Sequence, residues 1–247
     1  MPINIKPSCS KALLLCLLLS TQTANAGTES WQYSIMPYLW NVSFDGTTSS
    51  GGNDFPVDVD YSFFTLDNLD NVFSLKFEAN NGRIGILLDG LQAGYSDDTS
   101  NLLFDARLDV DLGYLEAAVS YKPAGFSHID IIGGIRYIFI DALFYLQPVI
   151  TPDRTIEEHH TWTDPLVGLR LQDTLGNSWF YQLRGDFGGF GVSSDMAINL
   201  LGVVGFSFNK NIAAELGYRY VSIDFKDDDF LYDVSMYGLI IGLGIHF

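Results

Sequence analysis

The residues best suited to chemistry stand together in one segment, Glu157-Glu158-His159-His160. Imidazole and carboxylate groups suit divalent transition metals, and a histidine beside carboxylates can also move a proton during hydrolysis. The spacing of the four residues matches no compact ligand motif. Glu157, Glu158, His159 and His160 are therefore candidate metal ligands, with a charged, solvated loop as the alternative interpretation.

The rest of the chain is strongly acidic. Its 13 Lys and Arg stand against 30 Asp and Glu, which gives a formal charge of −17 at pH 7. A nucleic-acid partner needs a basic face, so this balance excludes nucleic acid. Clustered carboxylates, such as the run Asp227-Asp228-Asp229, attract Ca²⁺ or Mg²⁺, so the sequence implies no cofactor beyond divalent cations at acidic loops.

Residues 1–26 have the pattern of a secretory signal peptide. Lys6 and Lys11 precede an apolar core, and Ala24-Asn25-Ala26 supplies the small residues of a cleavage site. Both cysteines of the chain fall within this segment, so we expect a mature chain, residues 27–247, without disulfides.

The mature chain alternates apolar and polar residues over many segments, which is the period of β-strands. Several segments exceed the nine to eleven or so residues with which a tilted strand crosses a bilayer. We predict ten strands, at 31–44, 71–80, 83–95, 104–121, 127–140, 162–172, 178–188, 195–208, 211–225 and 232–247.

The connections between these segments alternate between short and long, as the periplasmic turns and outer loops of a membrane barrel do. The sequence therefore predicts an all-β fold, a transmembrane antiparallel up-and-down β-barrel of about ten strands. Eight or twelve strands remain possible if the long connections hide or absorb a hairpin. An even number of strands places both termini on the periplasmic side. The last strand ends at Phe247 and resembles the closing strand of bacterial outer-membrane barrels, whose terminal Phe is the insertion signal.

Alternation also divides each strand into a lipid face and a lumen face. Acidic and basic residues accompany one another on the polar face, and unpaired buried charge is costly, so we predict a network of ion pairs across a largely occluded lumen. Its predicted members are Lys76, Glu78, Arg83, Asp89, Arg107, Asp109, Asp111, Arg136, Arg170, Arg184, Asp186, Glu215 and Arg219.

Aromatic residues gather toward the ends of the predicted strands. Trp and Tyr favour the two interfaces of a membrane, where an apolar ring can carry a polar tip. We therefore expect girdles formed by Trp31, Tyr33, Trp40, Tyr114, Tyr121, Trp162, Trp179, Tyr218 and Tyr220.

Four segments resemble a family of small proteobacterial outer-membrane β-barrel proteins of unassigned function. They are Met36-Pro-Tyr-Leu-Trp40, Trp162-Thr-Asp-Pro-Leu-Val-Gly-Leu-Arg170, Arg184-Gly-Asp-Phe-Gly-Gly-Phe-Gly191 and Gly217-Tyr-Arg-Tyr220. The resemblance implies a Gram-negative cell envelope and supplies no catalytic residues.

The expected function is a structural or narrow-pore, porin-like role in the bacterial outer membrane. Expected partners are outer-membrane lipid and lipopolysaccharide, and the barrel-assembly machinery during insertion; the oligomeric state stays open. The alternative is an outer-membrane hydrolase, protease- or lipase-like, with rim carboxylates such as Asp97-Asp98 and with His159. We expect no catalytic residue outside that alternative.

Overall fold

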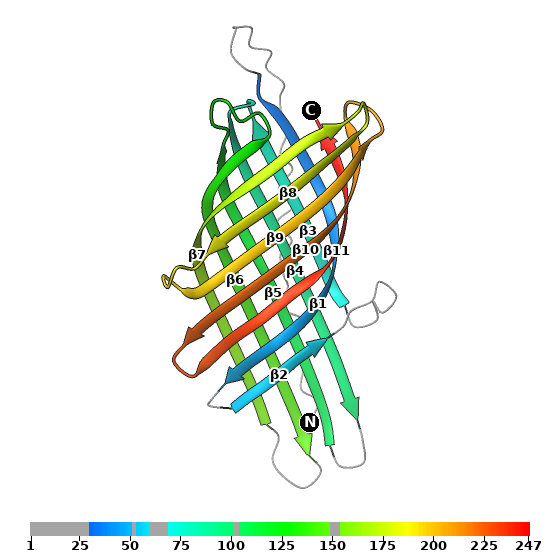
Figure 1. Ribbon diagram of the computed structural model, residues 1–247. Coiled ribbons are helices and arrows are strands. Elements are labelled where there is room, and N and C mark those ends of the chain that lie inside the picture. The colour runs from blue at the N-terminus through cyan, green and yellow to red at the C-terminus, as the bar shows by residue number, and fades with distance from the viewer. Residues whose placement is uncertain (1–29, 51–52, 60–68, 101–103, 149–153) are drawn as a thin grey trace.

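The computed structural model describes residues 30–50, 53–59, 69–100, 104–148 and 154–247, which form an antiparallel β-barrel (Figure 1). Among these residues, no helix is long and apolar enough to cross a bilayer. The signal-peptide segment lies outside the described residues. The strands are β1 (Gln32–Ser50), β2 (Asn53–Val59), β3 (Leu69–Asn80), β4 (Ile84–Ser100), β5 (Phe104–Tyr121), β6 (Ile129–Pro148), β7 (Arg154–Leu175), β8 (Trp179–Gly188), β9 (Ser194–Ser207), β10 (Ile212–Asp227) and β11 (Phe230–His246).

The barrel closes where the first strand pairs with the last. β1 pairs with β11 from Ser34↔His246 to Ser49↔Leu231, and its other edge pairs with β3 from Gln32↔Asn80 to Pro37↔Leu75. Every other strand pairs with its neighbour in sequence, so β1 and β3 to β11 make a closed ring of ten strands. This ring confirms the predicted fold and strand number. Full closure leaves no free sheet edge, which a spanning sheet cannot tolerate in lipid.

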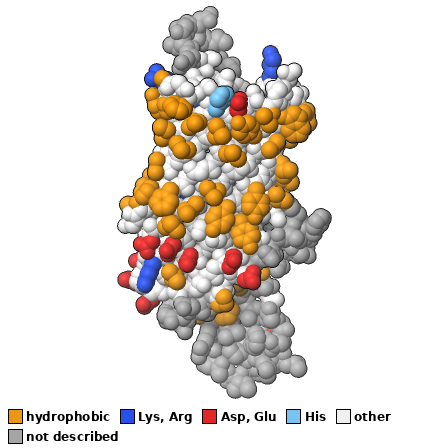
Figure 2. Space-filling view, viewed as in Figure 1, with side chains coloured by type: hydrophobic (Ala, Val, Ile, Leu, Met, Phe, Trp, Pro, Cys, Tyr) orange, Lys and Arg blue, Asp and Glu red, His pale blue; other side chains and the backbone are white. Residues whose placement is uncertain are grey.

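The distribution of apolar and charged side chains is the reverse of that in a water-soluble barrel. Leu115, Val119, Leu216 and Leu243 lie on the outside with 46–58% of their surface exposed, whereas charged side chains are buried inside. On the face that Figure 2 shows, the outward apolar side chains form two belts across the barrel, with acidic residues gathered beyond the lower belt. This arrangement fits a wall that faces hydrocarbon between two polar interfaces.

The polarity of the wall inverts beyond that belt. On β10 the outward positions run from Leu216 and Tyr218 to Asp224, while Val221 and Ile223 are buried on the inward side. Asp224 lies opposite Asp233 of β11. The outer part of the barrel therefore has a polar outside and an apolar inside, as expected for a wall in water.

The connections differ from the prediction in two respects. The strands extend further at the long-connection end than the alternation indicated, and β2 forms a hairpin with β1 from Phe44↔Val59 to Ser50↔Asn53. Residues 157–160, predicted as loop, lie within β7. Tyr33 and Phe247 exchange backbone hydrogen bonds of 3.0 Å, so the start of β1 and the end of the chain meet at the short-turn end.

Candidate functional site

A cross-lumen ion pair lies nearest the short-turn end. Arg170 on β7 donates from both terminal nitrogens to Glu78 on β3, at 2.8 and 2.9 Å, and its Nε donates to Asp130 on β6 at 2.9 Å. Gln172 adds a hydrogen bond to the same Asp130 oxygen at 3.0 Å. Because β3 and β7 are not adjacent, the contacts between Arg170 and Glu78 link opposite parts of the wall.

A second group of ion pairs fills the middle of the lumen. Arg136 on β6 bonds to Glu116 on β5 at 2.7 Å and to Asp186 on β8 at 2.8 Å. Arg184 on β8 bonds to the other oxygen of Glu116 at 2.6 Å and to Asp186 at 2.8 Å. Two guanidinium groups and two carboxylates thus form a closed ring of charge-assisted hydrogen bonds, which are the stronger kind.

Arg219 continues the group toward the outer end. Its Nε donates to the Asn199 amide oxygen at 2.8 Å, and its terminal nitrogen lies 3.2 Å from Asp89 across the lumen. Asp89 in turn accepts from the hydroxyls of Tyr38 and Tyr114, at 2.8 and 2.9 Å. Arg219 also donates to the Tyr114 hydroxyl.

We call Asp89, Glu116, Arg136, Arg184, Asp186, Asn199 and Arg219 the lumen network. Its three guanidinium groups face three carboxylates, so their charges balance. Glu116 and Arg219 have 0% and 1% of their surface exposed, so the charges of the network are largely buried. A charge desolvated in this way is tolerable only with its partners in place. The network therefore links the strands of the wall to one another from inside the barrel.

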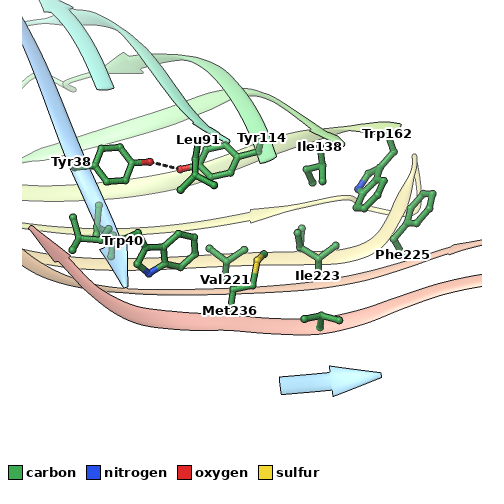
Figure 3. Packing of buried hydrophobic residues seen from close by; sticks show 14 of the residues in the cluster. Tyr38, Trp40, Leu91, Tyr114, Ile138, Trp162, Val221, Ile223, Phe225 and Met236 are labelled. Atoms are coloured by element: carbon green, nitrogen blue, oxygen red, sulfur yellow. Dashed lines mark hydrogen bonds between the residues drawn. The ribbon is translucent and has the colours of Figure 1, made fainter. Parts of the chain in front are cut away.

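Beyond the network, a group of apolar side chains lines the lumen (Figure 3). We call this group the outer cluster; it includes Trp40, Leu91, Ile138, Trp162, Val221, Ile223, Phe225, Val234, Met236 and Ile240. Trp162 stacks on Phe225 with ring centroids 4.1 Å apart. Of the buried side-chain nitrogens and oxygens in the described residues, Trp40 Nε1 and Trp162 Nε1 have no hydrogen-bond partner.

Most predicted lumen residues do lie in the lumen. Beyond those described above, Lys76 places its ammonium 4.9 Å from the centre of the Tyr38 ring, and Glu215 is half-buried on the inward side of β10. The structure thus brings together Glu78 with Arg170, and Asp89, Arg136, Arg184, Asp186 and Arg219 with one another.

Four predicted members lie elsewhere. Arg83 is exposed at the β3–β4 turn, over the Tyr121 ring, and lines an open pocket of about 410 Å³ there. Arg107, Asp109 and Asp111 face outward on β5, in the part of the wall whose polarity is inverted. Arg107 donates to Asp109 at 2.8 Å, and this hydrogen bond lowers the pKa of the Asp109 carboxyl.

The candidate metal ligands do not converge. Because alternate residues of a strand point to opposite faces, Glu158 and His160 share one side of β7, and Glu157 and His159 the other. His160 lies 3.1 Å from Glu158 and stacks on Phe230, whereas His159 pairs with Asp141 on β6. Among the described residues, no group of three or more His, Cys, Asp or Glu is arranged to hold a metal.

Among the described residues, the candidate residues of the hydrolase alternative do not come together in one site. Asp98 on β4 approaches Arg107 at 4.0 Å, whereas His159 lies on β7, three strands from β4, with Asp141 as its partner. The side chain of Asp97 lies outside the described ones.

Several functional residues were missed from the sequence. Glu116 lies in the run Tyr114-Leu115-Glu116-Ala117 of β5. Earlier in this strand the charged residues stand at odd-numbered positions, whereas Glu116 stands at an even-numbered one. Assigning one polar face to the whole strand therefore overlooks Glu116. Trp40, Tyr114 and Trp162, expected in the girdles, are buried in the lumen instead. The useful signal was the Leu115-x-Ala117-x-Val119 face, which marks the lipid side and so assigns Tyr114 and Glu116 to the interior.

No protein-family model matches the sequence, and no curated protein matches it. Among solved structures, the outer-membrane protease OmpT of Escherichia coli is similar with a TM-score of 0.44 and 9% identity, over 92% of this chain and 100% of that one. The attachment invasion locus protein Ail of Yersinia pestis gives 0.39 and 12%, over 89% and 100%. Neisserial surface protein A gives 0.33 and 14%, over 88% and 99%. These similarities concern the barrel fold alone.

Proposed function

We propose that the protein is an integral outer-membrane β-barrel with a structural role, whose lumen is closed to ions and solutes. Its outward apolar belts provide a bilayer-facing surface. The lumen network holds the wall together from within by linking β4, β5, β6, β8, β9 and β10.

One observation carries the proposal: buried ion pairs cross the lumen between strands that are not adjacent. Arg219 reaches Asp89, and Arg170 reaches Glu78, each from the other side of the barrel. An ion passing through would have to break these pairs and leave their charges without partners, which is strongly unfavourable for buried groups. The apolar outer cluster adds a second barrier, because it offers an ion no replacement for its water.

Solute permeation through proteoliposomes tests this closure. Vesicles containing the folded protein should swell in small sugars no faster than protein-free vesicles. The porin-like alternative, a narrow pore lined by these same charges, predicts faster swelling that depends on solute size. Swelling of that kind would overturn the structural proposal in favour of the pore.

The location and partners belong to the same proposal. The leader, residues 1–26, would direct export, and the short-turn end with Phe247 would face the periplasm and the assembly machinery. The acidic long-connection end would face lipopolysaccharide, with divalent cations between. Membrane fractionation, with protease access to a tag placed after Asp228, checks this orientation; cleavage in intact cells is expected, and protection there contradicts it.

A further inference from the structure

Two short turns at the same end of the barrel, β3–β4 and β5–β6, border one pocket (Figure 1). The pocket is open and has a volume of about 410 Å³. Gly82 lines it from the first turn and Gly125 from the second, and a Cβ atom added at either glycine would have nothing within 4 Å. Side chains therefore leave space between the two turns for a group of a ligand.

Two cations lie at this pocket. Arg83 and Lys122 both line it, and the backbone N–H of Lys122 donates to the Arg83 carbonyl at 2.8 Å, so the two residues face each other across β4 and β5. Like charges directly opposite each other on neighbouring strands are destabilising. An anion bound between the two side chains would replace this repulsion by two attractions.

The carboxylates in contact with this group do not balance its cations. Lys122 Nζ lies 3.9 Å from Asp130. Asp130 already bonds to Arg170 at 2.8 Å, and Arg170 also bonds to Glu78 at 2.8 Å. Three cations, Arg83, Lys122 and Arg170, thus stand against two carboxylates, which leaves an excess of one positive charge. A ligand group with one negative charge would make the whole group neutral.

The wall next to these cations is apolar on its outer face. Ile84 pairs with Tyr121 at the end of the β4–β5 ladder, and their side chains are 44% and 41% exposed. The Arg83 guanidinium lies over the Tyr121 ring, and Phe126, which lines the pocket, is 56% exposed. Cations and aromatic rings beside an apolar wall are typical of the level at which hydrocarbon gives way to lipid head groups.

We infer that this pocket binds the phosphate of an anionic phospholipid, with Arg83 and Lys122 as donors and the acyl chains along the wall at Ile84 and Tyr121. A guanidinium binds phosphate through paired hydrogen bonds, and a lysine ammonium binds it as a point charge. A phosphodiester carries one negative charge, which equals the excess of positive charge at the pocket. The inference rests on the bilayer insertion proposed above, but it does not require a closed lumen.

Native mass spectrometry of the folded protein, released from a non-ionic detergent, tests the site with phosphatidylglycerol as the probe. Phosphatidylcholine of a different mass, added at equal concentration, is the matched lipid, because it has the same phosphate but also carries a cation. One phosphatidylglycerol should stay bound at concentrations where phosphatidylcholine does not. The gel mobility of unheated protein shows separately that the barrel has folded, so a folded barrel that binds neither lipid would contradict this inference alone.

Arg83→Gln and Lys122→Gln should each weaken phosphatidylglycerol binding about tenfold, the effect of losing one charge-assisted hydrogen bond. Lys210→Gln is the matched control. Lys210 is an exposed cation in the β9–β10 turn, at the same end of the barrel, and it does not line the pocket. Its substitution should leave binding unchanged.

Three further results would overturn the inference. Equal binding of the two lipids would contradict a site for an anionic lipid. A loss of binding with Lys210→Gln as large as that with Arg83→Gln would show a general attraction to cations at this end and no specific pocket. Displacement of the lipid by millimolar inorganic phosphate would identify a site for a soluble anion in place of a lipid.

Discussion

Glu116 is the residue on which the lumen network depends most. Its two oxygens accept from Arg136 and Arg184, which otherwise share only Asp186. Glu116→Gln leaves a surplus buried cation, so we expect a loss of about 3–5 kcal/mol in unfolding free energy, as when one partner of a buried pair is removed. Urea unfolding followed by the gel mobility of unheated protein measures this loss.

Glu157→Gln is the matched control for that substitution. Glu157 is exposed on the outer part of β7, and removing an exposed charge changes stability by at most about 1 kcal/mol. Equal stability of the two variants would show that the network does not hold the barrel together.

How far single residues could be predicted depends on where their strand lies relative to the membrane. Asp89, Arg136, Arg184 and Arg219 stand where the outside is apolar, so alternation assigns them correctly to the interior. Arg107 and Asp109 follow the same alternation, but they lie where water replaces lipid outside the wall. The sequence pattern cannot distinguish the two regions without the position of the bilayer. The pairing of Arg219 with Asp89 could not be predicted from alternation either, because these residues meet across the lumen only once the barrel has closed.

At the scale of an element, Asp164 of β7 fixes the connection between β8 and β9. It accepts from the backbone N–H of Ser194 at 2.9 Å and from the Ser194 hydroxyl at 2.6 Å. That connection places Phe190 at φ +55°, an unfavourable conformation for a side chain of its size. The two hydrogen bonds offset this cost.

Asp164→Ala should therefore destabilise the barrel by about 1–3 kcal/mol, because the buried Ser194 N–H loses its acceptor. Thermal unfolding measures the change. Ser193→Ala is the control, since the exposed Ser193 hydroxyl donates only to the Thr163 carbonyl. A Ser193→Ala effect as large as that of Asp164→Ala would contradict the assignment.

The β10–β11 pair carries a pH-dependent element at its outer end. Burial, followed by repulsion from Asp233 and Asp195, raises the pKa of the Asp224 carboxyl. A raised carboxyl pKa disfavours the folded state at neutral pH, and the penalty disappears as pH falls below the pKa in the unfolded chain. Asp224→Asn should thus stabilise the barrel at pH 7, by up to about 1 kcal/mol for a like-charge cross-strand pair, and should have no effect near pH 3.

Thermal midpoints of the two proteins across that pH range check the prediction. A stabilising effect that is the same at both ends would mean that charge on Asp224 is not its source. If Asp224→Asn destabilised the barrel at pH 7, the Asp224 carboxylate would stabilise the folded state, contrary to the prediction.

At the scale of the whole molecule, the barrel has two regions in which the polarities of the inner and outer faces are exchanged. The region between the apolar belts carries charge inside and hydrocarbon-facing residues outside, while the outer region carries carboxylates outside and the outer cluster inside. Alternation and loop lengths predicted the ring of ten strands, because they reflect local backbone geometry. The added strand β2 escaped prediction, since its segment lies in water, where lipid imposes no strand length.

Closure of the lumen is the central claim, and single-channel recording in planar bilayers tests it most directly. Brominated lipid should first quench the outward-facing Trp31 and Trp179, which establishes insertion of the folded protein. The account then predicts a silent bilayer in salt solution, because the lumen network and the outer cluster leave no path for an ion. Discrete, reproducible conductance steps from the inserted protein would contradict it.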